Sequence, residues 1–139
     1  MALVDVRPGL RTLLLNNAQI TAMVQTRIYP VLLPQGTTLD SIVFTRITEL
    51  DLPHMTGPTG LVTARFQFDA WSKDVDSAMT LADLVKEVLT NFRGIVNYDS
   101  TFVNIQGAFL LNGRDDYDST SQMYRMSRDY YVYYGDRNA

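Results

Sequence analysis

The clearest pattern in the chain is a strict alternation of apolar and polar residues over positions 62–71. The apolar set is Val62, Ala64, Phe66, Phe68 and Ala70, and the alternate set is Thr63, Arg65, Gln67, Asp69 and Trp71. A period of two predicts a strand with one face on a core and the other against water or a partner. The face that ends at Trp71 is therefore a candidate interface, and a solvated outer sheet face explains it equally well.

Residues 72–92 have the spacing of a long amphipathic helix. The apolar stripe recurs every three or four residues and consists of Ala78, Leu81, Ala82, Val85, Val88, Leu89 and Phe92. We expect Ser72 to cap this helix and Gly94 to end it. Asp74 and Asp76 would then lie in its first turn, where the helix dipole favours negative charge. A stripe this wide is typical of a helix that packs on a sheet, and not of a cofactor-binding face.

Two shorter helices are predicted near the N-terminus. Pro8 suits a first helical turn, because its missing N–H has no partner there. Leu10, Leu13 and Leu14 follow at helical spacing and share one face. Asn17 is a good N-cap for a second short helix.

The segments between these helices predict two strands and a loop. Residues 27–30 are expected to be extended at a sheet edge, because Pro30 and Pro34 restrict this stretch. Residues 41–50 are rich in β-branched side chains and predict another strand. Residues 51–60 contain two prolines and two glycines, a composition that predicts a loop.

The C-terminal third predicts an extended β-hairpin that projects from the body. Residues 101–111 place Val103, Ile105, Phe109 and Leu111 on one face, with Gly107 interrupting it as a bulge or a close approach. Residues 122–134 form the second strand, and residues 112–121 a polar, turn-forming tip. The whole order predicts an α+β fold in one domain over residues 1–139. Its sheet is mainly antiparallel, with helices packed on one face and a long C-terminal β-hairpin.

Composition excludes several classes of function. The chain of 139 residues contains no Cys and a single His, so disulfides, thiolate nucleophiles and most zinc sites are excluded. Its net charge of −3 argues against a dedicated nucleic-acid binder, which needs a basic face. No signal peptide or membrane-spanning run is apparent.

Few residues of the chain are candidates for catalysis or metal binding. Asp115, Asp116 and Asp118 are hard oxygen ligands, but they lack the spacing of a calcium loop, so a solvated hairpin tip is the preferred interpretation. His54 is a possible general base with Asp51, yet no nucleophile motif accompanies them. No glycine-rich phosphate loop is present. We therefore expect no cofactor and no metal.

The order of short landmarks along the chain resembles the tail completion family of long-tailed bacteriophages. The landmarks are the leucine-rich first helix, Arg27–Pro30, Leu33–Gly36, Ile42–Phe44, Gly57–Leu61, Ala64–Trp71 with its following helix, and Tyr124–Tyr130. That family includes tail-to-head joining proteins and is similar to tail terminators. The resemblance implies a sheet sandwiched with helices, no catalytic residues, and a six-membered ring at the head-proximal end of the tail tube. The implied partners are further copies of the chain, the tail tube protein, and a head completion or connector protein, all within the virion.

The expected partner-binding segments are the loop at residues 51–59 and the tip at residues 112–121. Both are polar and longer than a plain hairpin requires. The candidate residues are Asp51, His54, Thr56, Trp71, Arg114, Asp115, Asp116, Tyr117 and Asp118. The mild negative charge suits a channel wall past which DNA slides without specific binding. A small host adaptor domain and a small hydrolase using His54 remain the alternatives, and two mobile loops without a partner are the simpler explanation of the segments.

Overall fold

The computed structural model describes residues 4–54 and 57–136, and over these ranges it confirms an α+β fold. The helices are α1 (Val6–Leu15), α2 (Ala18–Val24) and α3 (Val75–Asn91). The strands are β1 (Ile28–Pro30), β2 (Ser41–His54), β3 (Gly57–Ser72), β4 (Gly94–Tyr98), β5 (Thr101–Asp118) and β6 (Met123–Gly135).

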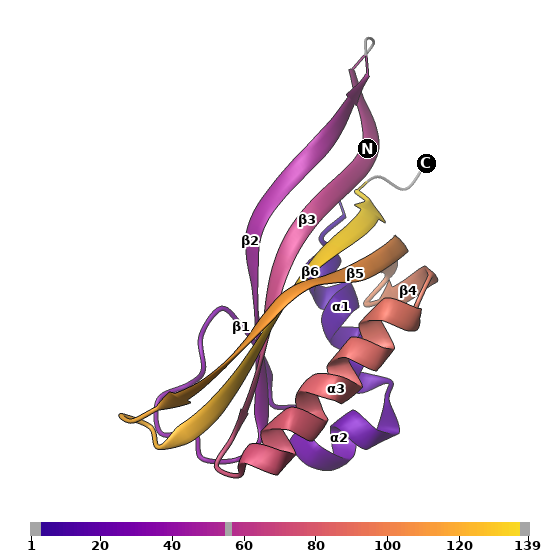
Figure 1. Cartoon of the computed structure of the whole chain (residues 1–139). Coiled ribbons are helices and arrows are strands. Elements are labelled where there is room, and N and C mark those ends of the chain that lie inside the picture. Colours follow the sequence, from indigo (N-terminus) through magenta and orange to yellow (C-terminus); the bar gives the residue numbers. More distant parts are fainter. Residues whose placement is uncertain (1–3, 55–56, 137–139) are drawn as a thin grey trace.

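The strands of the described chain form one curled sheet in the order β1-β2-β3-β6-β5-β4. All neighbours are antiparallel except the short β1, which runs parallel to β2. The three helices cover one face of this sheet, as predicted (Figure 1). Two hairpins reach beyond the helices in different directions. We call them the β2–β3 arm, at the top of the figure, and the β5–β6 arm, at its lower left.

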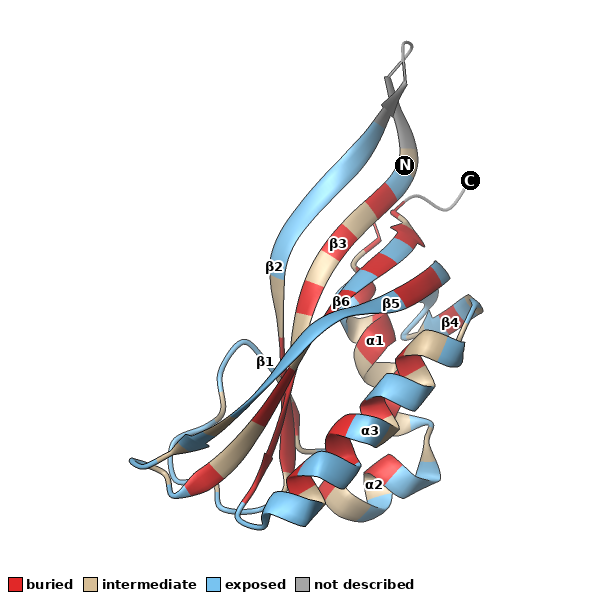
Figure 2. Ribbon diagram, in the orientation of Figure 1, coloured by how far each residue is buried: buried red, intermediate tan, exposed pale blue. Residues whose placement is uncertain are grey.

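The main core lies between the helices and the sheet (Figure 2). Five residues of the predicted α3 stripe are buried, namely Ala78, Leu81, Ala82, Val85 and Leu89, and Val88 and Phe92 pack against them. From the sheet, the rings of Phe44 and Phe68 stack, and the ring of Tyr130 meets Phe68 edge-on. The apolar set of β3 is buried throughout, which confirms the alternation.

The helix starts are set by side-chain caps. Asp5 caps α1, and Asn17 caps α2 as predicted, each accepting a hydrogen bond from a backbone N–H of the first turn. The expected cap of α3 was wrong: Asp74, and not Ser72, accepts from the Ser77 N–H. Ser72 still belongs to β3, where it pairs with Tyr124, so the helix begins after the strand has ended.

The predicted loop at residues 51–60 is instead the end of the β2–β3 arm. Pairing continues outward to Pro53 with Pro58 and His54 with Gly57. Prolines break central strands because they remove a ladder donor, but they are tolerated at sheet edges. Here β2 lies near the edge of the sheet, and the pairing of β3 with β6 extends no farther than Leu61.

The C-terminal hairpin is confirmed, with two corrections. Pairing of β5 with β6 runs to Asp118, so residues 112–118 are strand and the tip is much shorter than predicted. Register shifts between Ile105 and Gly107, and between Leu110 and Asn112, change which side chains face the core. Val103 and Ile105 are buried, whereas Phe109 and Leu111 are exposed, so these four do not share a face. The short strand β4, which pairs with the start of β5, was not predicted from the sequence.

Candidate interface surfaces

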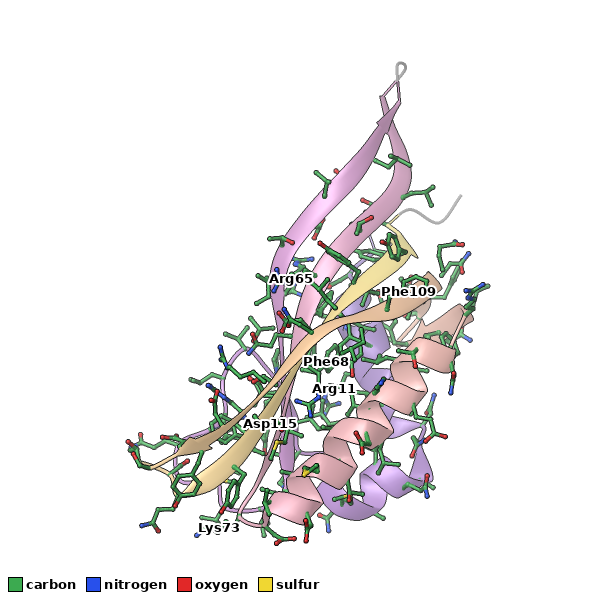
Figure 3. All side chains as sticks on the ribbon, in the orientation of Figure 1. Arg11, Arg65, Phe68, Lys73, Phe109 and Asp115 are labelled. Atoms are coloured by element: carbon green, nitrogen blue, oxygen red, sulfur yellow. The ribbon has the colours of Figure 1, made fainter. Side chains whose placement is uncertain are left out.

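The face of the sheet opposite the helices carries a network of polar side chains from β3 and β6. Arg65 and Asp129 form an ion pair at 2.5 Å, and the Gln67 amide donates to Asp69 at 3.0 Å. Asp69 and Asp129 are buried, whereas Arg65 and Gln67 are partly exposed. Figure 3 shows Arg65 on this side of the sheet, away from the helices. The polar set of β3 is therefore organised into pairs and is not simply solvated.

Several buried polar atoms on this face have no hydrogen-bond partner within the described chain. They are Arg65 Nε, Trp71 Nε1, Arg125 Nε and Ser127 Oγ. Buried donors without an acceptor cost about 1–3 kcal/mol each. These atoms are covered within the chain itself, so they do not by themselves mark a partner-binding surface.

Trp71 lies beneath a strap formed by residues 31–40, which link β1 to β2. Trp71 is 9% exposed and packs with Val43 and Met123. Leu33 of the strap and Tyr29 of β1 pack against this small cluster. The Arg125 guanidinium lies over the Trp71 ring at 5.6 Å from the centroid. A groove of about 650 Å³ runs between the strap and these residues. The alternation pattern placed Trp71 at the end of an open face, and this was wrong because the strap covers it.

The charges of the β5–β6 arm are matched across its two strands. The Asp116 carboxylate accepts from Arg114 at 2.9 Å and from Arg125 at 3.1 Å, and Asp115 accepts from Arg128 at 2.7 Å. The hydrogen bond from Arg125, together with that from Arg114, lowers the pKa of Asp116 below its usual range. Figure 3 shows Asp115 on this arm.

The end of the same arm is closed by local contacts. The Asp118 carboxylate accepts from the Thr120 N–H at 3.1 Å and from the Ser121 hydroxyl at 2.9 Å, which shapes the turn. The rings of Tyr117 and Tyr124 meet edge-on with centroids 5.0 Å apart. The predicted tip residues therefore lie together, and their carboxylates hold the arm in shape instead of forming an unpaired acidic patch.

The remaining predicted residues lie elsewhere. Asp51 is exposed on the β2–β3 arm, opposite Val62. His54 is in β2 opposite Gly57, and Thr56 lies outside the described residues. The structure thus brings Trp71 together with the β5–β6 arm, because Trp71 and Asp118 line the same groove and Arg125 contacts both Trp71 and Asp116. Asp51 and His54 lie apart from this group, on the β2–β3 arm (Figure 1).

An apolar surface near the base of the β2–β3 arm was missed by the sequence analysis. A groove of about 540 Å³ is lined there by Leu52, Leu61, Val62, Thr63, Gln106, Phe109, Tyr133 and Tyr134. The rings of Phe109 and Tyr133 meet edge-on at 5.7 Å. The sequence pattern had placed Phe109 on the same face as the buried Val103 and Ile105, so it gave no sign of this surface.

Over residues 4–54 and 57–136, no group of three or more His, Cys, Asp or Glu side chains is placed to hold a metal ion. In the same ranges, no helix has the length and apolar character needed to span a bilayer.

Comparison with known protein families shows to which family the chain belongs. The family described as Tail completion protein gp17 matches residues 8–135, from the first turn of α1 to the end of β6. The chain belongs to the tail completion family. As a member it is a structural protein of a phage-type tail and a component of the virion.

A solved structure has the same fold as this tail completion protein. It is a chain described as "Virion of native gene transfer agent (GTA) particle", with a TM-score of 0.66 and 16% sequence identity over 91% of each chain. At this identity the likeness concerns the fold alone. A search of curated proteins by sequence gave no match.

Proposed function

We propose that this tail completion protein forms a ring of six copies at the head-proximal end of the tail tube and joins the tail to the head there. The family match over residues 8–135 is the observation that carries this proposal. The partners are further copies of the chain, the tail tube protein, and a head completion or connector protein. The chain acts in this ring as a single domain.

The two arms support this role. A joining ring needs contacts with the tail on one side and with the head on the other. The β2–β3 arm carries Asp51 and His54, and the β5–β6 arm carries the segment from Arg114 to Asp118. Because the arms leave the body in different directions (Figure 1), each is available to a different neighbour.

The charge of the chain supports a passage through which DNA moves without being held. The net charge is −3, and Arg65, Arg114, Arg125 and Arg128 are all engaged by carboxylates. Phosphate binding needs basic side chains that are free to displace counterions. Such a surface favours transit and not specific binding.

The proposal assigns no catalytic step to the chain. A His54→Ala variant should therefore assemble tails and join heads as the unaltered protein does. A loss of infectious particles with intact folding of the variant would instead favour a role for this histidine, such as the hydrolase alternative.

The position in the particle can be tested by labelling the protein in isolated virions and imaging them by electron microscopy. The label should lie at the junction of tail and head. Particles made without the protein should accumulate as separate heads and tails. Label at the far end of the tail, or normal joining without the protein, would refute the proposal.

A further inference from the structure

Two stretches of strand at opposite sides of the sheet have an open edge. On one side, β1 pairs with β2 only from Ile42 to Phe44, which leaves residues 45–50 without an outer neighbour in the described chain. On the other side, β4 pairs with β5 only from Thr101 to Ile105, which leaves residues 107–118 open in the same way. Backbone hydrogen bonds from the described loops and turns reach neither stretch.

The two open stretches lie at the same height along the strands. Thr45 pairs with Gln67, which pairs with Asp129, which pairs with Asn112. Leu50 is linked in the same way, through Thr63 and Tyr133, to Gly107. Residues 45–50 of β2 and 107–112 of β5 are therefore level with each other on opposite edges of one sheet.

The strand directions allow one copy to continue the sheet of the next. From β2 to β5 there are three antiparallel steps, so β2 and β5 run in opposite directions. A second copy related by rotation about an axis along the strands places its β5 beside the first copy's β2, antiparallel to it. Antiparallel ladders are the better of the two pairing geometries. The contact uses different surfaces on the two copies, which is the type that generates rings.

The side chains of the β5 edge favour association, and on β2 the two charged side chains of residues 45–50, Arg46 and Glu49, form an ion pair with each other. Residues 106–113 of β5 contain no charged residue and no proline, the two features that most often protect an open edge. Phe109, Leu110 and Leu111 are 53%, 38% and 40% exposed, and on β2 Ile47 and Leu50 are 46% and 72% exposed. Apolar open edges of this kind are association sites when they are left uncovered.

We propose that residues 45–50 of β2 in one copy form an antiparallel ladder with residues 107–112 of β5 in the next copy. The neighbour is a second copy of this chain, because the open edges match each other in height and direction. A foreign strand on one edge would leave the other uncovered. Beyond the ladder, β1 occupies one edge and β4 the other, so the ladder is limited to about six residues per copy. The inference rests on the proposed ring and specifies how its subunits meet.

Engineered disulfides test this arrangement, because the natural chain contains no Cys. Thr45→Cys is combined in turn with Phe109→Cys, Asn112→Cys or Arg114→Cys, positions that lie on the face away from the helices. Within one copy, β3 and β6 separate β2 from β5. The Cα atoms are then about 14 Å apart, too far for a disulfide, so any bond must join two copies.

Mild oxidation of tails assembled from at least one of these variants should give a series of disulfide-linked dimers, trimers and larger species. Thr45→Cys with Met79→Cys is the matched control, since Met79 is exposed on α3 and away from the sheet edges. The proposal would be overturned if none of the three pairs forms disulfide links or if the links stop at dimers. It would also be overturned if the control gives the same series of linked species.

A charge on the open edge gives a second test. Leu111 has no β6 partner in the register, so Leu111→Lys leaves the ladder of the arm intact. When this change is added to the double-cysteine variant that links best, the yield should fall at least tenfold, whereas Met79→Lys in the same variant should not reduce it. Equal yields from both changes would overturn the proposal. If the protein lies at the tail–head junction but its copies form no disulfide-linked series, only the edge pairing is refuted. If the linked series forms but the protein lies elsewhere in the particle, only the proposed position is refuted.

Discussion

Gly9 in α1 lies so close to the sheet that an added methyl group would overlap a buried side chain. A Cβ at this position would be 2.5 Å from Cγ1 of Val103 on β5, with the ring of Tyr98 at 3.6 Å. Val103 is fully buried, and its β-branched side chain has little rotamer freedom with which to move away. Gly9→Ala therefore requires α1 to shift outward by roughly 1 Å to restore ordinary carbon contacts.

Two effects of opposite sign decide the stability of this variant. Replacing a mid-helix glycine by alanine favours the helix by up to about 1 kcal/mol. Overpacking a well-filled core costs about 1–3 kcal/mol. The overlap with Val103 is below any usual contact distance, so we expect the second effect to prevail. The free energy of unfolding should fall by roughly 1–2 kcal/mol, which lowers Tm by about 3–8 °C for a chain of this size.

Urea denaturation of four proteins measures this balance: the natural chain, Gly9→Ala, Val103→Ala and the double variant. Val103→Ala alone should cost roughly 2 kcal/mol through lost burial. In the double variant the new methyl group occupies part of the vacated space, so its loss should be at least about 1 kcal/mol smaller than the sum of the single losses. A Gly9→Ala protein that is as stable as the natural chain, or strictly additive losses, would refute the reasoning.

Three further predictions concern the tyrosines of β6 and the β5–β6 arm. The Tyr130 hydroxyl is buried without a partner among the described residues, so Tyr130→Phe should raise the free energy of unfolding by roughly 1 kcal/mol in urea denaturation; a loss would mean that the hydroxyl is bonded to ordered water. Burial raises the pKa of Tyr134 to about 12, so stability should be full below pH 10 and fall as the pH rises from 10 towards 12. Tyr134→Phe should weaken that fall in a series of alkaline melts, and an unchanged slope would contradict the cause given. Replacing Asp115, Asp116 and Asp118 by Asn should speed amide hydrogen exchange in the arm but not in α3; unchanged protection of the arm would show that its ion pairs contribute nothing.

The elements with a long, regular period were predictable from the sequence. The α3 stripe and the alternation of β3 each repeat often enough to specify which side faces the core. The five residues of β4 are too few to establish a period, and their pairing with β5 is visible only in three dimensions. The prolines at 53 and 58 suggested a loop because composition does not reveal that a strand lies at an edge.

The candidate site was less predictable, because it depends on register and on cover from distant segments. One extra residue at a bulge moves every following side chain to the other face, which is why Phe109 is exposed. The contact of Asp115 with Arg128 joins two strands and follows only from their register. Trp71 is covered by a strap that no periodicity in β3 could indicate.

The place of β6 in the sheet has a consequence for how the protein folds during synthesis. This strand lies between β3 and β5, yet it follows both of them in the chain, and Leu61 at one end of β3 pairs with Gly135. On the ribosome, β2 with β3 and β4 with β5 can form as local hairpins, but they have no common sheet until β6 emerges. Until then Phe66 and Phe68 have no finished core to enter. The long loop that β6 closes slows folding, and the nascent chain depends on its last strand to bury what its earlier strands expose.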